Sequence, residues 1–255
     1  MTRFAVWTTA THVCSDAPPD PRQHSSVIRA AYAGRVNPGY SAILFDLDGT
    51  ITDSAPGITS TLVYTLEKLG LPIPSPAELL RYVGPPIMDS FRDYAGMDLE
   101  TAERALEIYR EKYLNVGAYD SSLYEGVPQL LRRIGESPLK MSLATSKPET
   151  PATLILEHYS LARCFDVITG ASDDEVRSAK KDVVAEALLR LTALGADMTN
   201  PVLIGDRIHD VEGAAENGIP TIFVTWGYGT PAEQAGAVAV VDTPEELAAL
   251  LFPTD

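Results

Sequence analysis

The sequence is poor in cysteine and in positive charge, which limits the kinds of site that it can carry. Its 255 residues include only two cysteines, Cys14 and Cys164, which lie far apart with no CxxC pattern. Two reduced thiols are therefore expected rather than a disulfide or a cysteine-based metal site. The formal net charge of −15 argues against a nucleic-acid partner, because such a surface needs a basic face. An anionic ligand stays compatible, since a metal ion and a lysine can reverse the local field.

Segments that would direct the chain into a membrane or out of the cell are also missing. No apolar run reaches the roughly 18 residues of a membrane-spanning helix, and the amino terminus lacks the apolar stretch of a secretory signal. We therefore expect a cytoplasmic protein with no membrane partner. The apolar share of 45% is ordinary for a globular protein, and the length allows a substantial core. No pattern indicates an oligomeric state.

The amino-terminal region differs from the rest of the chain. Residues 1–40 contain Asp16-Ala17-Pro18-Pro19-Asp20-Pro21 and scattered Ser and Thr, and neither helical nor strand periodicity extends over a useful length. We expect this region to be a disordered or weakly helical leader, with residues 25–33 as the candidate for one short helix, and we assign it no chemistry.

Two acidic residues stand at the end of the first predicted strand. The apolar run at 41–45 is short, leans towards β structure and is bounded by turn residues, which suits a buried strand of a parallel sheet. Asp46 and Asp48 follow it, and residues i and i+2 share one face of a strand. Because two uncompensated carboxylates at such spacing are costly, this arrangement calls for a divalent metal.

Only helical patterns follow, from residue 56 to residue 120. Ser54 is expected to cap a first helix that ends at Gly70, and Ser75 opens a capping-box pattern. The clearest helix of this part is predicted at 99–114, where apolar residues form one stripe. Since an uninterrupted βαβ unit would not contain a run of several helices between two strands, we interpret 56–120 as an inserted helical cap.

From Gly126 onward, strand and helix patterns alternate. Strands are predicted at 141–144, 165–169, 201–204 and 221–224, with a short edge strand near 238–241. Strands separated by helices of this length imply a doubly wound parallel sheet with right-handed crossovers. The predicted fold class is therefore α/β, with a Rossmann-like core formed by 41–55 and 121–255 and an all-helical cap at 56–120.

Four polar clusters are expected at one edge of this sheet, each just after a strand. They are Asp46 with Asp48, Thr145, Lys180 or Lys181, and Asp206 with Asp210. Each alone is explained as well by a solvated turn, a helix cap or a surface lysine. Their occurrence at four successive strand ends indicates a catalytic site, because ligands of open α/β sheets bind at that edge.

These clusters resemble the four motifs of the haloacid dehalogenase superfamily. The likeness rests on Phe45-Asp46-Leu47-Asp48-Gly49-Thr50, on Thr145, on a lysine before a helix, and on Gly205-Asp206-Arg207-Ile208-His209-Asp210. The helices at 56–120 resemble the first cap type of that superfamily, and the nearest likeness is to its phosphoglycolate-phosphatase-like branch. A proline often follows the motif lysine in that branch, whereas Lys181 follows Lys180 here. The spacing to the following helix favours Lys180.

The resemblance implies a Mg²⁺-dependent phosphatase for a small phosphorylated metabolite, either phosphoglycolate-like or nucleotide-like. Asp46 would be the nucleophile that forms an aspartyl-phosphate and also a metal ligand, and Asp48 would be the general acid and base. The Asp48 backbone carbonyl and Asp206 would bind the metal, and Asp210 would hold a metal-bound water or orient the lysine. The residues expected to bind the phosphate oxygens are Thr145, Ser146 and Lys180. The segment Val83-Gly84-Pro85-Pro86 is a candidate for substrate specificity.

Other functions stay open at this point. Asp48 favours phosphate esters over dehalogenation or phosphonate cleavage, which need no acid to protonate an alkoxide, and leaves a phosphomutase as an alternative. Ala144-Thr145-Ser146-Lys147, Gly170-Ala171-Ser172 and Trp226-Gly227-Tyr228-Gly229 are similar to a bacterial protein-tyrosine kinase of the same fold, although no GxxxxGK[ST] loop for ATP is present. A non-catalytic interaction module is the third alternative, and the intact acids argue against it.

Overall fold

The structure is a computed structural model, and it describes residues 39–174 and 176–252. All of them belong to one of the two units into which the chain divides, Asn37–Asp255. The predicted leader at 1–40 lies outside the described residues, apart from Gly39 and Tyr40.

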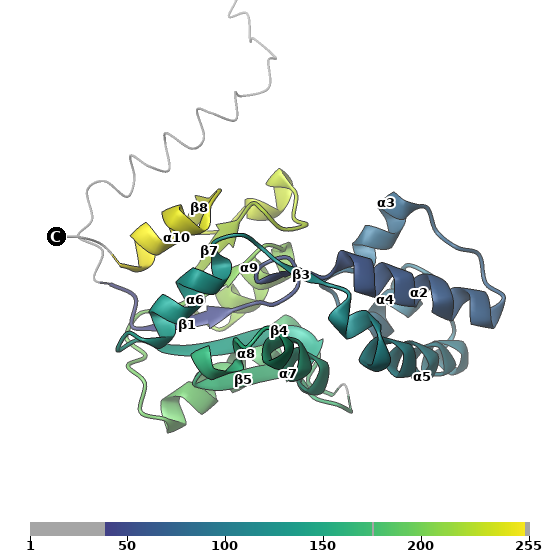
Figure 1. The fold of residues 1–255 in the computed structure, drawn as a ribbon, viewed down its shortest axis with the longest axis horizontal. Coiled ribbons are helices and arrows are strands. Elements are labelled where there is room, and N and C mark those ends of the chain that lie inside the picture. The colour runs from purple at the N-terminus through teal and green to yellow at the C-terminus, as the bar shows by residue number, and fades with distance from the viewer. Residues whose placement is uncertain (1–38, 175, 253–255) are drawn as a thin grey trace, which may run out of the picture. The chain divides into compact units, whose positions relative to one another are not determined.

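A six-stranded sheet forms the core of the molecule (Figure 1). Its order is β5-β4-β1-β6-β7-β8, and every neighbouring pair is parallel. The strands are β1 (Ala42–Phe45), β4 (Lys140–Pro148), β5 (Val167–Ala171), β6 (Pro201–Gly205), β7 (Thr221–Val224) and β8 (Ala239–Val241). The doubly wound parallel sheet predicted from the alternating pattern is thus confirmed.

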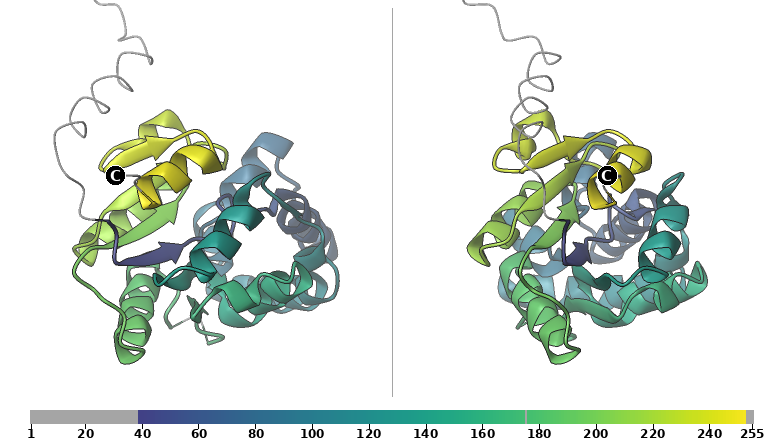
Figure 2. Two further views of the ribbon diagram at one scale, coloured as in Figure 1. Left: turned by 60° about the vertical axis from the view of Figure 1, so that its left-hand side comes forward. Right: turned by 90° about the vertical axis from the view of Figure 1, so that its left-hand side faces the viewer.

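Helices cover both faces of the sheet because its central strands are apolar on both faces. In β1, Ala42 and Leu44 belong to the apolar cluster that includes α8 (Lys180–Ala193) and α9 (Ile208–Glu216). Ile43 and Phe45 point the other way, into the larger cluster. Helices that contribute to this larger cluster include α6 (Val127–Gly135), α7 (Glu149–His158) and α10 (Pro244–Leu251), together with helices from residues 55–119. Figure 2 shows α10, in yellow, beside α6, in teal.

Residues 55–119, called the helical segment below, contain helices joined by turns and irregular stretches, with no strand. They form α2 (Ala55–Leu69), α3 (Pro76–Leu79), α4 (Ile87–Asp93) and α5 (Leu99–Asn115), with 3₁₀ turns at Leu80–Tyr82 and Gly117–Tyr119. The residues predicted to form the stripe of α5, among them Tyr109 and Tyr113, are buried. None of the described helices has the length and apolar character needed to cross a bilayer. The division into a core and an inserted cap at 56–120 stays a prediction.

The chain enters and leaves the helical segment through a small antiparallel pair, β2 (Thr52–Asp53) and β3 (Ser122–Leu123). The predicted cap at Ser54 is wrong, because its side chain accepts no hydrogen bond from the first turn of α2. Instead, the Tyr228 hydroxyl accepts hydrogen bonds from the Ser54 N–H at 2.8 Å and the Ala55 N–H at 2.9 Å. The same hydroxyl donates to Asp53 Oδ1 at 2.7 Å, so a distant tyrosine satisfies this helix start.

Candidate active site

Three of the predicted acids meet at the carboxyl ends of β1 and β6. These strands are neighbours in register, with Phe45 opposite Ile204, so Asp46 and Asp206 follow them at the same edge. Asp210 lies in the first turn of α9, which begins just after β6. Asp46, Asp206 and Asp210 are all buried, and one carboxylate oxygen of each lies within 4.8 Å of the others.

Lys180, the first residue of α8, supplies a positive charge to this group. Its Nζ lies 2.7 Å from Asp46 Oδ1 and 2.8 Å from Asp210 Oδ1, and it donates a hydrogen bond to the Ala144 carbonyl at 3.0 Å. The side chain of Lys181 is 51% exposed and faces Glu216 at 3.5 Å. The structure therefore places Lys180, and not Lys181, among the acids.

The charges of this group are unbalanced. Burial and the charges of Asp210 and Asp46 raise the pKa of Asp206 well above its ordinary value. Burial disfavours the charged form of Lys180, but the carboxylates of Asp210 and Asp46 outweigh it and raise the pKa of this lysine. Three carboxylates thus face one ammonium group. Closely spaced oxygen donors with excess negative charge fit a bound divalent cation such as Mg²⁺.

Asp206 is held by both neighbouring loops. It accepts hydrogen bonds from the Thr50 hydroxyl at 3.1 Å and from the Tyr228 N–H at 2.7 Å. Gly49 makes this approach possible, because its φ is +87° and a Cβ at this position would lie 2.3 Å from Asp206 Oδ2. The glycine of the DxDGT sequence is therefore required both by the turn and by the carboxylate beside it.

Asp48 is buried beside the acid cluster, and its partner is Lys147, which was not predicted as a site residue. Lys147 Nζ lies 2.9 Å from Asp48 Oδ2, and Lys147 is itself buried. Burial disfavours the charged form of Lys147, but the charge of Asp48 outweighs it and raises the pKa of this lysine. A single lysine after a strand is typical of a surface position, so no local signal distinguished it.

Thr145 and Ser146, the predicted phosphate ligands on β4, are both buried. The Thr145 hydroxyl accepts a hydrogen bond from the Lys147 N–H at 3.3 Å. Because Phe45 of β1 pairs with Leu143 of β4, Thr145 and Ser146 stand at the same edge of the sheet as the residues that follow β1. The predicted phosphate-binding side chains and the acids are therefore neighbours in the fold.

Two cavities adjoin these residues. The first, of about 310 Å³, has Asp48 and Lys147 in its wall, together with three tyrosines of the helical segment. Those tyrosines are Tyr82, Tyr109 and Tyr113. The second, of about 300 Å³, has Ser146 and Lys180 in its wall. Gly84 and Pro85 of the predicted specificity segment line the first cavity, and Pro85 also lines the second.

The segment Val83-Gly84-Pro85-Pro86 is tied to the core by one arginine. Arg207 Nη1 donates a hydrogen bond to the Val83 carbonyl at 2.6 Å, and Arg207 Nε lies 2.9 Å from Glu233 Oε2. Arg207 is the residue after Asp206, so the link starts directly beside the acid cluster. Arg207 belongs to the motif at 205–210, but its role was not predicted, because Val83 and Glu233 are distant from it in the sequence.

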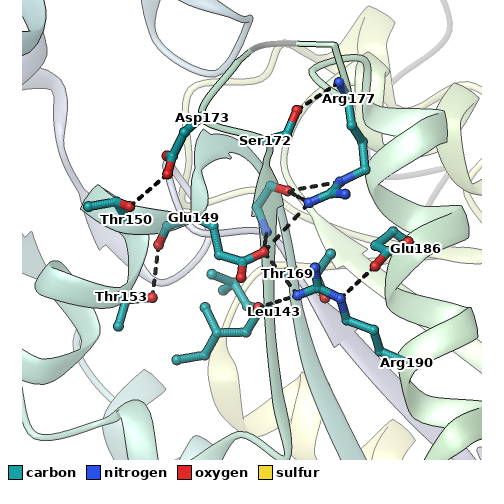
Figure 3. A network of polar contacts seen from close by, with 12 residues as sticks. Leu143, Glu149, Thr150, Thr153, Thr169, Ser172, Asp173, Arg177, Glu186 and Arg190 are labelled. Atoms are coloured by element: carbon teal, nitrogen blue, oxygen red, sulfur yellow. Dashed lines mark hydrogen bonds and ion pairs between the residues drawn. The ribbon is translucent and has the colours of Figure 1, made fainter.

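A network of polar contacts joins the start of α7, the segment after β5 and α8, the helix that begins at Lys180 (Figure 3). Glu149 Oε2 lies 2.9 Å from Arg190 Nη1 of α8 and 3.7 Å from Arg177 Nη2. Thr150 donates a hydrogen bond to Asp173 Oδ2 at 3.2 Å, and both residues line the first cavity. Because several charges share one carboxylate, this network orients α8 more firmly than an isolated surface ion pair could.

Comparison with known proteins agrees with this geometry. A family model described as haloacid dehalogenase-like hydrolase matches residues 43–224. The tyrosine-protein kinase PtkA of Mycobacterium tuberculosis is 42% identical over 196 residues, which are 76% of this chain but only 65% of the kinase. A 5'-nucleotidase of Pseudomonas aeruginosa is 37% identical over 194 residues, which are 76% of this chain and 86% of that protein.

Among solved structures, a predicted phosphatase from Clostridium acetobutylicum superposes with a TM-score of 0.76. It is 39% identical in sequence, and the match covers 82% of this chain and 96% of that one. The matched family region includes both strand-end acid pairs, Asp46 with Asp48 and Asp206 with Asp210. The chain therefore belongs to the haloacid dehalogenase-like hydrolase family of enzymes.

Proposed function

We propose that this protein is a phosphatase that hydrolyses a small phosphate monoester, phosphoglycolate-like or nucleotide-like, with Mg²⁺ as its cofactor. One observation carries the proposal: Asp46 is paired with Lys180 and lies within 4.8 Å of two further buried aspartates, while Asp48 lines an adjoining cavity of about 310 Å³. That arrangement combines a nucleophile, a cation site and a second carboxylate facing the space for a leaving group.

In the first displacement, a carboxylate oxygen of Asp46 attacks phosphorus and forms an aspartyl-phosphate. The bond from phosphorus to the leaving oxygen breaks, and its electron pair stays on that oxygen. Asp48 gives this oxygen a proton, so the product departs as a neutral alcohol. Lys180 keeps the Asp46 carboxylate oriented through Oδ1 and places a positive charge next to the incoming phosphoryl group.

In the second displacement, water replaces the aspartate. Asp48, now a carboxylate, takes a proton from the water as its oxygen attacks phosphorus. The bond between phosphorus and the Asp46 oxygen breaks, which releases inorganic phosphate and restores both acids. Thr145 and Ser146, buried at the end of β4, are the proposed donors to the phosphate oxygens.

Asp46, Asp206 and Asp210 are the residues that would hold Mg²⁺, together with the Asp48 backbone carbonyl implied by the family motif. When bound, this ion supplies positive charge against the phosphate oxygens and the three carboxylates. Uncatalysed phosphate-monoester hydrolysis is among the slowest of biological reactions, so charge stabilisation of this kind is needed to reach useful rates.

The test is release of inorganic phosphate from a panel of monoesters, with Mg²⁺ or with EDTA. The panel contains 2-phosphoglycolate, nucleoside 5'-monophosphates and p-nitrophenyl phosphate. We expect Mg²⁺-dependent release that Asp46→Asn abolishes without loss of the folded circular dichroism spectrum. Asp197→Asn, in an exposed loop far along the chain, is the matched control and should keep wild-type activity. Release that survives Asp46→Asn would refute the proposal.

A protein-tyrosine kinase is the second candidate, and the 42% identity to PtkA favours it. Transfer of labelled phosphate from ATP to a tyrosine-containing peptide, with no release of phosphate from monoesters, would replace the phosphatase by this function. A phosphomutase would instead return the phosphoryl group to its substrate, giving an isomeric ester in place of inorganic phosphate. A protein that shows none of these three activities, phosphatase, kinase or phosphomutase, is an interaction module.

A further inference from the structure

Lys147 is the one buried lysine in the described chain, apart from Lys180, that is paired with a predicted catalytic acid. Its Nζ lies 2.9 Å from Asp48 Oδ2, and both side chains are less than a tenth exposed. Asp48 Oδ1, in contrast, has no hydrogen-bond partner among the described residues. The two oxygens of the proposed general acid are therefore not equivalent. Oδ2 is paired with Lys147, and Oδ1 is the oxygen that can exchange a proton with a substrate.

A second contact joins the same lysine to the helical segment. Lys147 Nζ donates a hydrogen bond to the Tyr113 hydroxyl at 3.0 Å and lies 4.7 Å from the centre of that ring. The Tyr113 ring stacks on Tyr109, with centroids 5.4 Å apart and planes 9° from parallel. Lys147 is thus fixed from the side of α5 as well as from β4, and its ammonium cannot swing freely away from Asp48.

We propose that Lys147 is a positioning residue for Asp48, which rests on the proposed function. By accepting from Lys147 at Oδ2, the Asp48 carboxyl carries its transferable proton on Oδ1. When the bond from phosphorus to the leaving oxygen breaks and its electron pair stays on oxygen, Oδ1 delivers the proton. The Asp48 carboxylate that results keeps its ion pair with Lys147 until water returns a proton in the second displacement.

The consequence is a dependence on the leaving group. Protonation by a positioned acid contributes about 10²–10⁴-fold to rate, and a misplacement of about 1 Å can cost roughly 10²-fold. Loss of positioning therefore harms esters whose leaving oxygen needs a proton. Esters of acidic phenols, which leave as stable anions, are harmed much less. A purely structural role for Lys147 would lower both rates by the same factor.

The experiment compares kcat/KM for phenyl phosphate and p-nitrophenyl phosphate, two substrates of similar shape. This parameter covers the steps up to the first displacement, where the leaving group departs. For Lys147→Met we expect a loss on the order of 10²-fold with phenyl phosphate and a loss at least about tenfold smaller with p-nitrophenyl phosphate. Equal losses with both substrates, or no loss with either, would overturn the proposal.

Two further variants complete the design. Lys140→Met removes another lysine of β4, at the start of the strand and away from the acid cluster. Lys140 Nζ lies 2.6 Å from Asp166 Oδ1, and the variant should leave both kcat/KM values unchanged. Tyr113→Phe removes only the hydroxyl that orients Lys147, so it should give the same selective loss on a several-fold scale even if Lys147→Met does not fold. No selectivity in Tyr113→Phe, like equal losses in Lys147→Met, counts against the proposal.

Failure of this inference is distinguishable from failure of the proposed function. If the wild-type protein hydrolyses both esters and Asp48→Asn shows the selective loss while Lys147→Met does not, only the role of Lys147 is wrong. If the wild-type protein releases no phosphate from either ester, the phosphatase itself is wrong, and the role of Lys147 falls with it.

Discussion

Replacing Asp206 by asparagine should make the metal-free protein more stable while removing its response to metal. Asp206 shares its surroundings with Asp46 and Asp210, each with an oxygen within 4.8 Å. At an effective dielectric constant of about 20, two carboxylate charges at that separation repel each other by roughly 3.5 kcal/mol. Asparagine removes the charge and keeps the shape of the side chain.

The hydrogen bonds of Asp206 allow this exchange. The amide oxygen of asparagine can accept from the Tyr228 N–H, which donates to Asp206 at 2.7 Å. The amide nitrogen can then donate to the Thr50 hydroxyl, because a hydroxyl both donates and accepts. Both contacts are kept, but the Thr50 O–H loses its acceptor and the amide adds a second N–H, which offsets part of the electrostatic gain of Asp206→Asn.

The expected net gain is smaller than the gross repulsion. Lys180 offsets part of the negative charge, and proton uptake by the buried acids offsets more. We expect about 1–2 kcal/mol at neutral pH in EDTA, which is at the lower end of what replacing buried charges yields. For a chain of this size, each kcal/mol moves Tm by about 2–4 °C, so Tm should rise by about 2–8 °C.

The pH dependence of this gain has a definite sign. Burial and the charges of Asp210 and Asp46 raise the pKa of Asp206, so the folded state holds the proton more tightly than the unfolded state. In metal-free wild-type protein, the stabilisation that protonated Asp206 gives to the folded state is therefore fully present at pH values below its ordinary pKa of 3.8. This stabilisation is lost as pH rises through the raised pKa. The advantage of Asp206→Asn should accordingly grow as pH rises.

The assay is thermal unfolding, followed by circular dichroism, in EDTA and in a series of Mg²⁺ concentrations. A ligand at 100 times its Kd stabilises the folded state by about 2.7 kcal/mol, and wild-type protein should show such a shift. Asp206→Asn should lose most of it, whereas the exposed-loop control Asp197→Asn should behave as wild type. A lower Tm for Asp206→Asn in EDTA, or an unchanged response to Mg²⁺, would refute the reasoning.

Further predictions follow from single contacts, and urea unfolding measures each of them. Lys180→Met leaves two buried carboxylates without their ammonium group and should cost about 3–5 kcal/mol, whereas Lys181→Met, at a 51% exposed side chain, should stay within about 0.5 kcal/mol. Gly49→Ala forces a φ of +87° on alanine and brings its Cβ against Asp206, so we expect a loss of about 2–5 kcal/mol. Tyr228→Phe deprives the start of α2 of its hydroxyl acceptor and should cost about 1–3 kcal/mol. Equal effects of the two lysine variants, or a silent Gly49→Ala or Tyr228→Phe, would contradict the contacts described.

The acids were accessible from the sequence because their placement depends on local features. A short apolar run predicts a buried strand, and whatever follows such a strand stands at the carboxyl edge of a parallel sheet. Asp46 and Asp206 each come within two residues of a strand end, so predicting the strands was enough to bring the two acids to one edge. Which of two adjacent lysines faces them depends on where α8 begins, and the structure starts that helix at Lys180.

Other features depend on partners distant in the chain. The β5 strand was predicted at 165–169 but spans Val167–Ala171, and just before it the Asp166 carboxylate accepts a hydrogen bond from the Met141 N–H at 2.9 Å. The turn at Ser54 looked like a side-chain cap, yet its acceptor is the hydroxyl of Tyr228, 174 residues later. In both cases the partner, the Met141 N–H or the Tyr228 hydroxyl, lies far from the residue in the sequence, so local patterns could not reveal it.

Lys147, in the candidate site, also has contacts that could not be predicted from the sequence, because its partners are distant in the chain. Its burial is produced by Tyr113, which lies 34 residues earlier and belongs to the helical segment, and by Asp48 from another strand end. A lysine in Thr145-Ser146-Lys147-Pro148 carries no sign of either contact. Periodicity identified Tyr113 as a buried position of α5, but it could not say that the hydroxyl of a buried tyrosine would point at a lysine of the core.

Under the proposed function, these contacts predict that the metal ion binds before the phosphate monoester. Four buried carboxylates, those of Asp46, Asp48, Asp206 and Asp210, face the two ammonium groups of Lys147 and Lys180, a formal excess of two negative charges. A phosphate monoester adds more negative charge to the same edge of the sheet. Without a cation the ester would be repelled at short range, where the low dielectric of a buried site strengthens the effect. Because both lysines are already paired with the acids, the Mg²⁺ proposed among Asp46, Asp206 and Asp210 would supply the further positive charge that offsets this repulsion.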